Sequence, residues 1–162
     1  MASPVNDSYT VASGLTAHVG RPLPGLTGDV IVTGDSLTDT SFNSYGGAYG
    51  LARTGYPPRV IYNDAVQGQQ MKAIVDRLAA TLDANPTAKV CMIRMGTNGH
   101  GGTSHAFQFQ RAIDIMAARG VFGIFHAIPP KTGENGTFPP INAALAAICA
   151  ANPRTLAFIY DC

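Results

Sequence analysis

The chain has 162 residues, of which 46% are hydrophobic and 13% charged, and its formal net charge is +1. This composition is typical of a single soluble domain, and it leaves no excess of cationic side chains for binding nucleic acid or an anionic membrane surface. No apolar run approaches the roughly 18 residues of a membrane helix, and the N-terminus lacks the pattern of a signal peptide.

The first 28 residues are rich in Gly, Pro, Ser and Thr and show no clear periodicity. We interpret residues 1–28 as an arm or linker and residues 29–162 as the folded domain. An arm of this kind is suited to attaching a domain to a larger assembly, such as a cell-surface complex or a virus particle.

Strand and helix signals alternate through the rest of the chain. The predicted strands cover residues 30–33, 59–62, 89–95, 121–127 and 156–160. This alternation predicts an α/β fold in which five parallel strands, joined by right-handed crossovers, form a three-layer flavodoxin-like sheet.

Three predicted helices separate the later strands, and each has one apolar face. The first helix places Met71, Ile74, Val75, Leu78 and Leu82 inward and ends at residues 85–86. The second, over residues 105–119, turns Phe109, Ile113 and Met116 inward and stops at Gly120. The third carries Ile141, Ala144, Leu145 and Ile148 on one face and ends at residues 152–153. Cys91 and Cys149 lie in apolar segments and are expected to be core residues.

A polar loop follows each of the first three predicted strands. The loops read Gly-Asp-Ser-Leu at 34–37, Asn-Asp-Ala-Val-Gln-Gly at 63–68 and Met-Gly-Thr-Asn at 95–98. Parallel sheets keep their chemistry at the carboxyl ends of the strands, so these loops are predicted to meet at one edge. Taken singly, Ser36 is equally typical of a turn or helix cap, and Asn98 of a loop cap.

In order and spacing, the three motifs resemble the first three sequence blocks of the SGNH (GDSL) hydrolases. The resemblance in layout extends from about residue 29 to the C-terminus. The resemblance implies the strand order 2-1-3-4-5. It also implies that Ser36 is a nucleophile whose own N–H forms an oxyanion hole with the Gly68 N–H and the Asn98 amide. The residue types suit this role, because acyl transfer places negative charge on a carbonyl oxygen that fixed donors must meet. No cofactor is implied.

The general base is the difficulty, because a serine hydroxyl needs a partner that takes its proton. SGNH hydrolases use an Asp-x-x-His block beyond the fifth strand, and residues 160–162 read Tyr-Asp-Cys without such a block. We therefore expect the domain to be truncated at its C-terminus, or its base to come from a partner chain. His126 and His100 are the candidate bases or substrate contacts. Gly99 stands where many relatives have an aspartate.

Other polar residues receive structural interpretations. Asp35 is expected to bond to neighbouring loops, Asp39 and Asp64 to cap turns, and Asp161 to be structural. Tyr45 and Tyr49 either line the substrate pocket or pack as ordinary loop residues. The four histidines show no pairing typical of a metal site, so no metal is predicted.

Two functions from different classes remain open. The first is a serine ester hydrolase, with a small ester or a carbohydrate O-acetyl group as substrate. The second is a catalytically incomplete binding or structural module that keeps the sheet and the pocket without the base.

Overall fold

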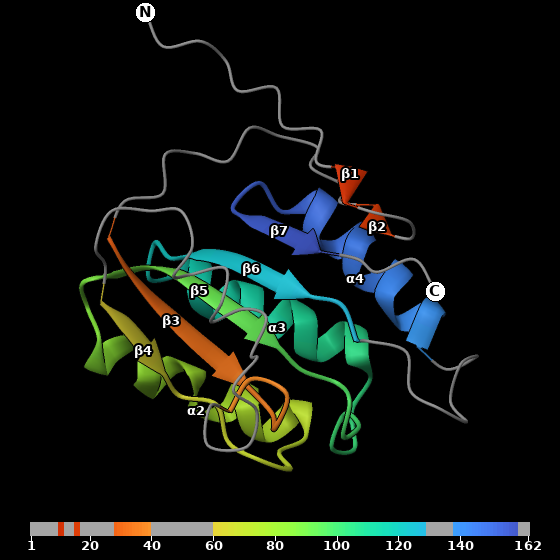
Figure 1. The fold of residues 1–162 in the computed structure, drawn as a ribbon, viewed down its shortest axis with the longest axis horizontal. Coiled ribbons are helices and arrows are strands. Elements are labelled where there is room, and N and C mark those ends of the chain that lie inside the picture. The colour runs from red at the N-terminus through yellow and green to blue at the C-terminus, as the bar shows by residue number, and fades with distance from the viewer. Residues whose placement is uncertain (1–9, 12–14, 17–27, 40–59, 129–137, 159–162) are drawn as a thin grey trace, which may run out of the picture.

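A computed structural model describes residues 10–11, 15–16, 28–39, 60–128 and 138–158. One parallel sheet organises it, with strands in the order β4-β3-β5-β6-β7 (Figure 1). The strands are β3 (Asp29–Gly34), β4 (Ile61–Asn63), β5 (Ala88–Arg94), β6 (Phe122–His126) and β7 (Thr155–Phe158). Counted along the chain, this is the predicted order 2-1-3-4-5, which is confirmed.

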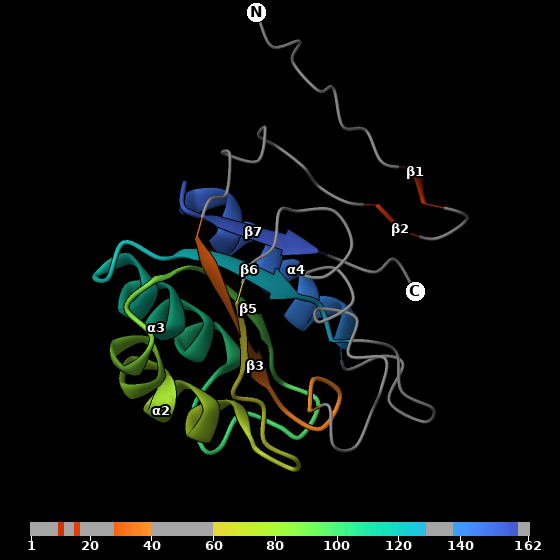
Figure 2. The same cartoon turned by 60° about the vertical axis from the view of Figure 1, so that its left-hand side comes forward.

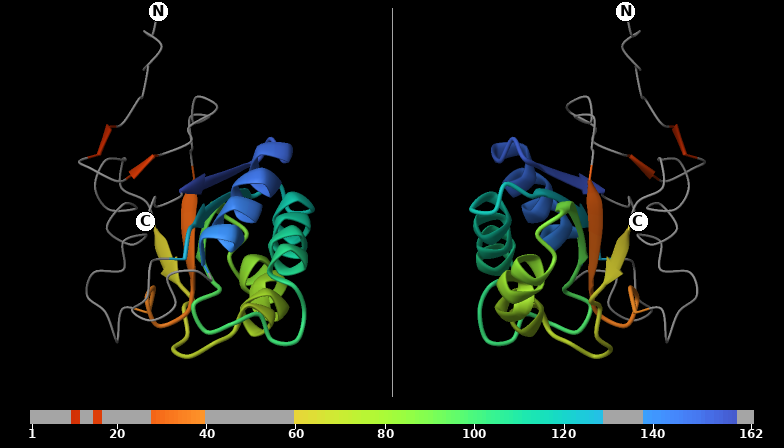
Figure 3. Two further views of the ribbon diagram at one scale, coloured as in Figure 1. Left: turned by 90° about the vertical axis from the view of Figure 1, so that its right-hand side faces the viewer. Right: turned by 90° about the vertical axis from the view of Figure 1, so that its left-hand side faces the viewer.

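Helices connect the later strands and cover one face of the sheet. They are α2 (Met71–Ala84), α3 (His105–Ala117) and α4 (Phe138–Ala151). With the sheet seen nearly edge-on, all three lie on the same side (Figure 3). The opposite face carries a second buried cluster, made of Val30, Val32, Val90, Met92, Phe122 and Ile124. No helix within the described ranges packs on that face.

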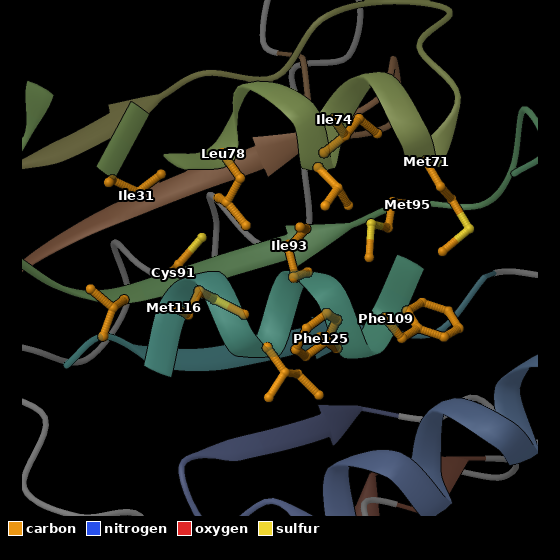
Figure 4. Packing of buried hydrophobic residues seen from close by; sticks show 14 of the residues in the cluster. Ile31, Met71, Ile74, Leu78, Cys91, Ile93, Met95, Phe109, Met116 and Phe125 are labelled. Atoms are coloured by element: carbon orange, nitrogen blue, oxygen red, sulfur yellow. The ribbon is translucent and has the colours of Figure 1, made fainter. Parts of the chain in front are cut away.

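The main core lies between the sheet and these helices. The predicted inward face of α2 is confirmed in full, since all five of its apolar residues are buried. Those of α3 are buried as well, and Figure 4 shows Phe109 and Met116 beside Ile93 and Phe125 of the sheet. Burying one large aliphatic or aromatic side chain contributes about 1.5–3 kcal/mol, so this layer supplies much of the stability that holds the strand ends in place.

The predicted inward face of α4 is partly wrong. Its buried residues are Phe138, Asn142, Leu145 and Cys149. Ile141, Ala144 and Ile148 are only half-buried. Apolar residues lie around most of this helix, so the apolar pattern does not determine which face turns inward. A polar contact determines it instead. The Asn142 side chain accepts a hydrogen bond from the Ile128 N–H and donates one to the Ile128 carbonyl, both at 2.9 Å.

A short hairpin within residues 1–28 was not predicted. Strand β1 (Thr10–Val11) pairs antiparallel with β2 (Leu15–Thr16). Strands of two residues are too short to leave a periodic signal in the sequence.

The two described cysteines are core residues, as predicted. Cys91 and Cys149 are free and buried. Burial raises the pKa of the Cys91 thiol to about 12 and that of Cys149 to about 11, so neither is a nucleophile at neutral pH. None of the described helices is both long and apolar enough to cross a membrane.

The Asn142 contact predicts a stability effect. Asn142→Ala would leave the buried N–H and carbonyl of Ile128 without partners, and we expect a loss of about 3 kcal/mol in the free energy of unfolding. Urea denaturation measures it. Gln110→Ala is the control, because Gln110 is exposed and bonds only Asp114, at 2.8 Å. Equal effects of the two substitutions would contradict the assigned role of Asn142.

Candidate active site

The turn that carries Ser36 begins where β3 ends. The Asp35 carbonyl accepts hydrogen bonds from the N–H groups of Thr38 and Asp39, at 3.0 and 3.1 Å. The Asp35 carboxylate accepts a third from the N–H of Leu37, at 3.0 Å. These bonds wind residues 35–39 into a single tight turn, in which Ser36 is half-buried and therefore still accessible.

Gly34 sits at a crowded point before this turn. A Cβ atom there would lie 2.3 Å from the Arg94 carbonyl oxygen and 2.8 Å from the Thr38 hydroxyl. Any side chain would push β5 or the turn away, so glycine is required for the close approach.

The second loop, residues 64–70, is attached directly to the turn that carries Ser36. The Val66 N–H donates to the Gly34 carbonyl at 3.0 Å, and the Asn63 side chain donates to the Thr38 carbonyl at 3.2 Å. Gly68 is exposed in this loop, with φ of +74°, which favours glycine. Neither the Ser36 N–H nor the Gly68 N–H donates to another described residue. Both stay available to a ligand.

The third loop brings the Asn98 amide to Gly68. The Asn98 Nδ2 atom donates to the Gln69 carbonyl at 3.2 Å, next to Gly68 in the chain. An amide nitrogen carries two hydrogens, so one remains for a ligand. The Met71 N–H donates to the Gly99 carbonyl at 3.0 Å, which joins the start of α2 to the third loop. Figure 2 shows the segments that follow β3, β4 and β5 meeting beyond one end of the sheet. The structure thus brings Ser36, Gly68 and Asn98 into connected loops.

The N-terminus of α2 adds a favourable field at this point. The helix starts at Met71, three residues after Gly68, and its first turn contains no acidic residue. The partial positive charge of a helix N-terminus favours an anion nearby, and no side chain in that turn cancels it.

Asp35, the first residue of the turn that carries Ser36, is fully buried. Burial raises the pKa of its carboxyl, although the Leu37 N–H and the charge of Arg94 act in the opposite direction. The Thr97 hydroxyl of the third loop lies near this carboxylate, beyond normal hydrogen-bond geometry. The one hydrogen bond that this carboxylate accepts among the described residues comes from Leu37 of its own turn, so the expected hydrogen bond to a neighbouring loop is not found there.

Several buried polar atoms around this turn have no hydrogen-bond partner in the described part of the chain. They are Asp35 Oδ2, Thr38 Oγ1, Arg94 Nε and Thr97 Oγ1. Each such group costs about 1–3 kcal/mol, and native proteins hold few of them.

His126 lies in the sheet, on β6, two strands from β3, which leads to Ser36. In the ladder Gly34 pairs with Arg94, and Arg94 with His126, which places His126 about 10 Å from Gly34 at ordinary strand spacing. The side chain is 5% exposed. Burial, with a smaller contribution from the charge of Arg94, lowers the pKa of His126 to about 4. An imidazole with that pKa is a weak proton acceptor at neutral pH.

His100 lies in the third loop, two residues after Asn98, and is exposed. Its ring packs edge-on against His105 at the start of α3, with ring centroids 4.9 Å apart. Burial and the nearby His100 lower the pKa of His105. The structure therefore places His100 in the loop of Asn98, with its ring against His105.

Other site candidates divide into two groups. Tyr45, Tyr49 and Asp161 lie outside the described residues. Asp64 is described, and its carboxylate pairs with Arg77 and accepts a hydrogen bond from Thr81 at 2.7 Å.

No group of three or more His, Cys, Asp and Glu that could hold a metal ion occurs among the residues described.

Sequence reasoning missed Arg77. It belongs to α2, one position before the buried Leu78, and its guanidinium reaches the first two motif loops. A charged residue beside an apolar face is normally read as a solvated rim, so only the folded arrangement reveals its contacts.

The low pKa of His126 predicts a pH effect on stability. An unfolded histidine binds a proton near pH 6.5, whereas folded His126 does so only near pH 4. Between these values the unfolded state binds more protons than the folded state. The free energy of unfolding therefore decreases as the pH is lowered from about 6.5 to about 4, and this residue accounts for about 3 kcal/mol of the decrease. Urea denaturation at pH 7 and pH 4 should show that His126→Gln loses less stability than the wild type. The same loss in both proteins would contradict the buried, neutral imidazole.

Comparisons with known proteins address the fold. No family model matches the chain, and no curated protein matches it. Solved structures do match. AlinE4, an SGNH-hydrolase family esterase, has 18% identity and a TM-score of 0.61, over 80% of this chain and 75% of that one. A putative lipolytic protein of the G-D-S-L family from Desulfitobacterium hafniense has 15% identity and a TM-score of 0.64, over 81% and 76%.

A third match is the psychrotrophic esterase EstA from Pseudoalteromonas sp., in a structure inhibited by monoethylphosphonate. It has 14% identity and a TM-score of 0.60, over 82% of this chain and 78% of that one. At these identities the similarity concerns the arrangement of the chain. The sheet order, the helices and the matches lead to one conclusion: this chain has the fold of the SGNH (GDSL) hydrolases, of which the described residues form the parallel sheet and the helical layer on one of its faces.

Proposed function

We propose that this protein is a serine ester hydrolase that works through an acyl-enzyme on Ser36. One observation carries the proposal: the Asn98 amide is held on the Gln69 carbonyl, beside Gly68. The Gly68 loop is in turn bonded to the nucleophile turn through Val66 and Gly34. A nucleophile and three oxyanion donors thus come from connected loops at one edge of the sheet.

The reaction follows from these groups. The Ser36 oxygen attacks the ester carbonyl and its proton passes to a base, while the carbonyl oxygen becomes an oxyanion. The N–H groups of Ser36 and Gly68 and the Asn98 amide would stabilise that charge. Collapse expels the alcohol, which takes up the proton, and leaves the acyl group on Ser36. Water then attacks the acyl-enzyme in the same way and releases the acid.

The general base is part of the proposal. His126 is buried and has a pKa of about 4, which disfavours it. His100 is exposed in the loop of Asn98 and is the better placed of the two. We propose that the base is His100, or a group from outside the described residues or from a partner chain.

The substrate class is proposed at the level of a small ester or a carbohydrate O-acetyl group. All three matching structures described above are esterases or lipolytic proteins by name. The phosphonate inhibitor of EstA supports the use of phosphonate probes here. We also propose that residues 1–28 form an arm, within which β1 and β2 pair.

A binding module is the second candidate function. The observation in its favour is that His126 is 5% exposed and has a pKa of about 4, which makes it a weak proton acceptor at neutral pH. An oxyanion hole without a base still accelerates hydrolysis about 10³-fold over water, so slow turnover of an activated ester does not separate the two functions. Reaction of the nucleophile itself does.

A fluorophosphonate probe tests the nucleophile. We expect intact mass spectrometry to show one adduct per chain, peptide mapping to place it on Ser36, and Ser36→Ala to abolish it. Heat-denatured protein is the control for nonspecific labelling. A folded protein that forms no adduct would contradict the hydrolase and favour the binding module.

Asn98→Ala tests the oxyanion hole. Loss of one donor should lower kcat on p-nitrophenyl acetate by about 10²- to 10³-fold, with a small change in KM, because the donor acts mainly on the transition state. Asn85→Ala is a matched control, since Asn85 caps the C-terminal end of α2, with its amide on the Thr81 carbonyl at 2.8 Å. An Asn98→Ala variant with wild-type kcat would remove Asn98 from the machinery.

A further inference from the structure

A single guanidinium, that of Arg77, joins the first two motif loops. Its Nη2 atom donates to the Gly34 carbonyl at 3.2 Å, and its Nη1 atom to the Thr33 hydroxyl at 3.2 Å. Nη1 also reaches the second loop, where it donates to the Asp64 carbonyl at 2.5 Å and pairs with the Asp64 carboxylate. The strand end before Ser36 and the start of the Gly68 loop therefore share one donor group.

The same side chain also reaches the residue that follows Gly68. Arg77 Nε donates to the Gln69 side-chain oxygen at 2.8 Å. The backbone carbonyl of Gln69 is the acceptor that holds the Asn98 amide. Arg77 thus acts directly on two loops and, through Gln69, on the third.

The chemistry of these contacts favours arginine in particular. A guanidinium offers five N–H donors in a rigid planar fork, and here the fork serves acceptors on the strand, on Asp64 and on Gln69. Lysine would supply a point charge that cannot span them. The Arg77 side chain is 20% exposed and lies in the middle of α2, next to the buried Leu78, so the fork is carried by a packed helix.

From these contacts we infer that Arg77 is a positioning residue, which sets the place of the Gly68 and Asn98 donors relative to the Ser36 turn. The inference rests on the proposed function for its catalytic consequence. Arg77 does not itself reach Ser36, so it acts through Gly34, Asp64 and Gln69.

Three variants separate this role from general stability. Arg77→Ala removes the fork and Arg77→Lys keeps the charge alone. Arg119→Ala is the matched control, because Arg119 also pairs with an aspartate, Asp83 of α2, at 2.7 Å, but away from the motif loops. Should Arg77→Ala fail to fold, Arg77→Lys carries the test.

The first readout is structural and does not depend on activity. In amide NMR spectra of the full chain, we expect the Gly68 N–H and the Asn98 side-chain signals to shift in both Arg77 variants, and those of α4 and β7 to stay in place. Arg119→Ala should leave Gly68 and Asn98 unchanged. Wild-type positions of these signals in Arg77→Lys and Arg77→Ala would overturn the inference.

The second readout is kinetic. A misplacement of about 1 Å costs about 10²-fold in rate, so we expect Arg77→Ala to lower kcat by about 10²-fold with KM within about 3-fold of wild type. The effect should also shrink in an Asn98→Ala background, since the displaced donor is then already absent. A rise in KM at constant kcat would overturn the catalytic consequence.

Inactivity of the wild type towards ester and probe would refute the proposed function instead. The NMR readout would still decide the role of Arg77.

Discussion

The parallel pairing of β3 with both of its neighbours is the constraint on which the rest of the site depends. Val32 pairs with Asn63 of β4, and Gly34 pairs with Arg94 of β5. Because parallel strands end at the same edge, this register places the loops after all three strands together. A slip by one residue would turn Thr33 away from α2 and break its contact with Arg77. The register therefore fixes both the loops and the group that joins them.

Strand order and helix faces could be predicted because they follow from short-range patterns. The apolar residues of α2 recur every three or four positions, with charged residues between them, and each predicted inward position is buried. The face of α4 could not be predicted in the same way, since apolar residues surround it and a hydrogen-bonded asparagine selects its rotation. Periodicity carries no information about a polar contact of this kind.

The motif residues of the candidate site could be predicted from the sequence, but the side-chain contacts that hold its loops together could not. Ser36, Gly68 and Asn98 stand in recognisable loops, whereas the partners of Arg77 come together only in the folded chain. The same limit applies to His126. Its place at the end of a strand suggested a base, but its pKa of about 4 depends on burial and on Arg94 from the adjacent strand, which sequence spacing does not reveal.

Preorganisation distinguishes this edge of the sheet from a set of ordinary turns. The Asn98 amide is held on the Gln69 carbonyl and the Val66 N–H on the Gly34 carbonyl, and these bonds connect one loop to the next. Donors fixed before the reaction need no reorganisation when charge develops, which is why such arrangements are effective in acyl transfer. In the proposed hydrolase, a base would complete the chemistry and these donors would determine where the substrate carbonyl sits.

A crystal structure of the phosphonylated protein would test the central claim most directly. We expect phosphorus bonded to the Ser36 oxygen. We also expect one phosphonyl oxygen within hydrogen-bond distance of the Ser36 N–H, the Gly68 N–H and the Asn98 amide, because that oxygen mimics the oxyanion. A phosphonyl oxygen turned away from Gly68 and Asn98, or an adduct on another residue, would contradict it.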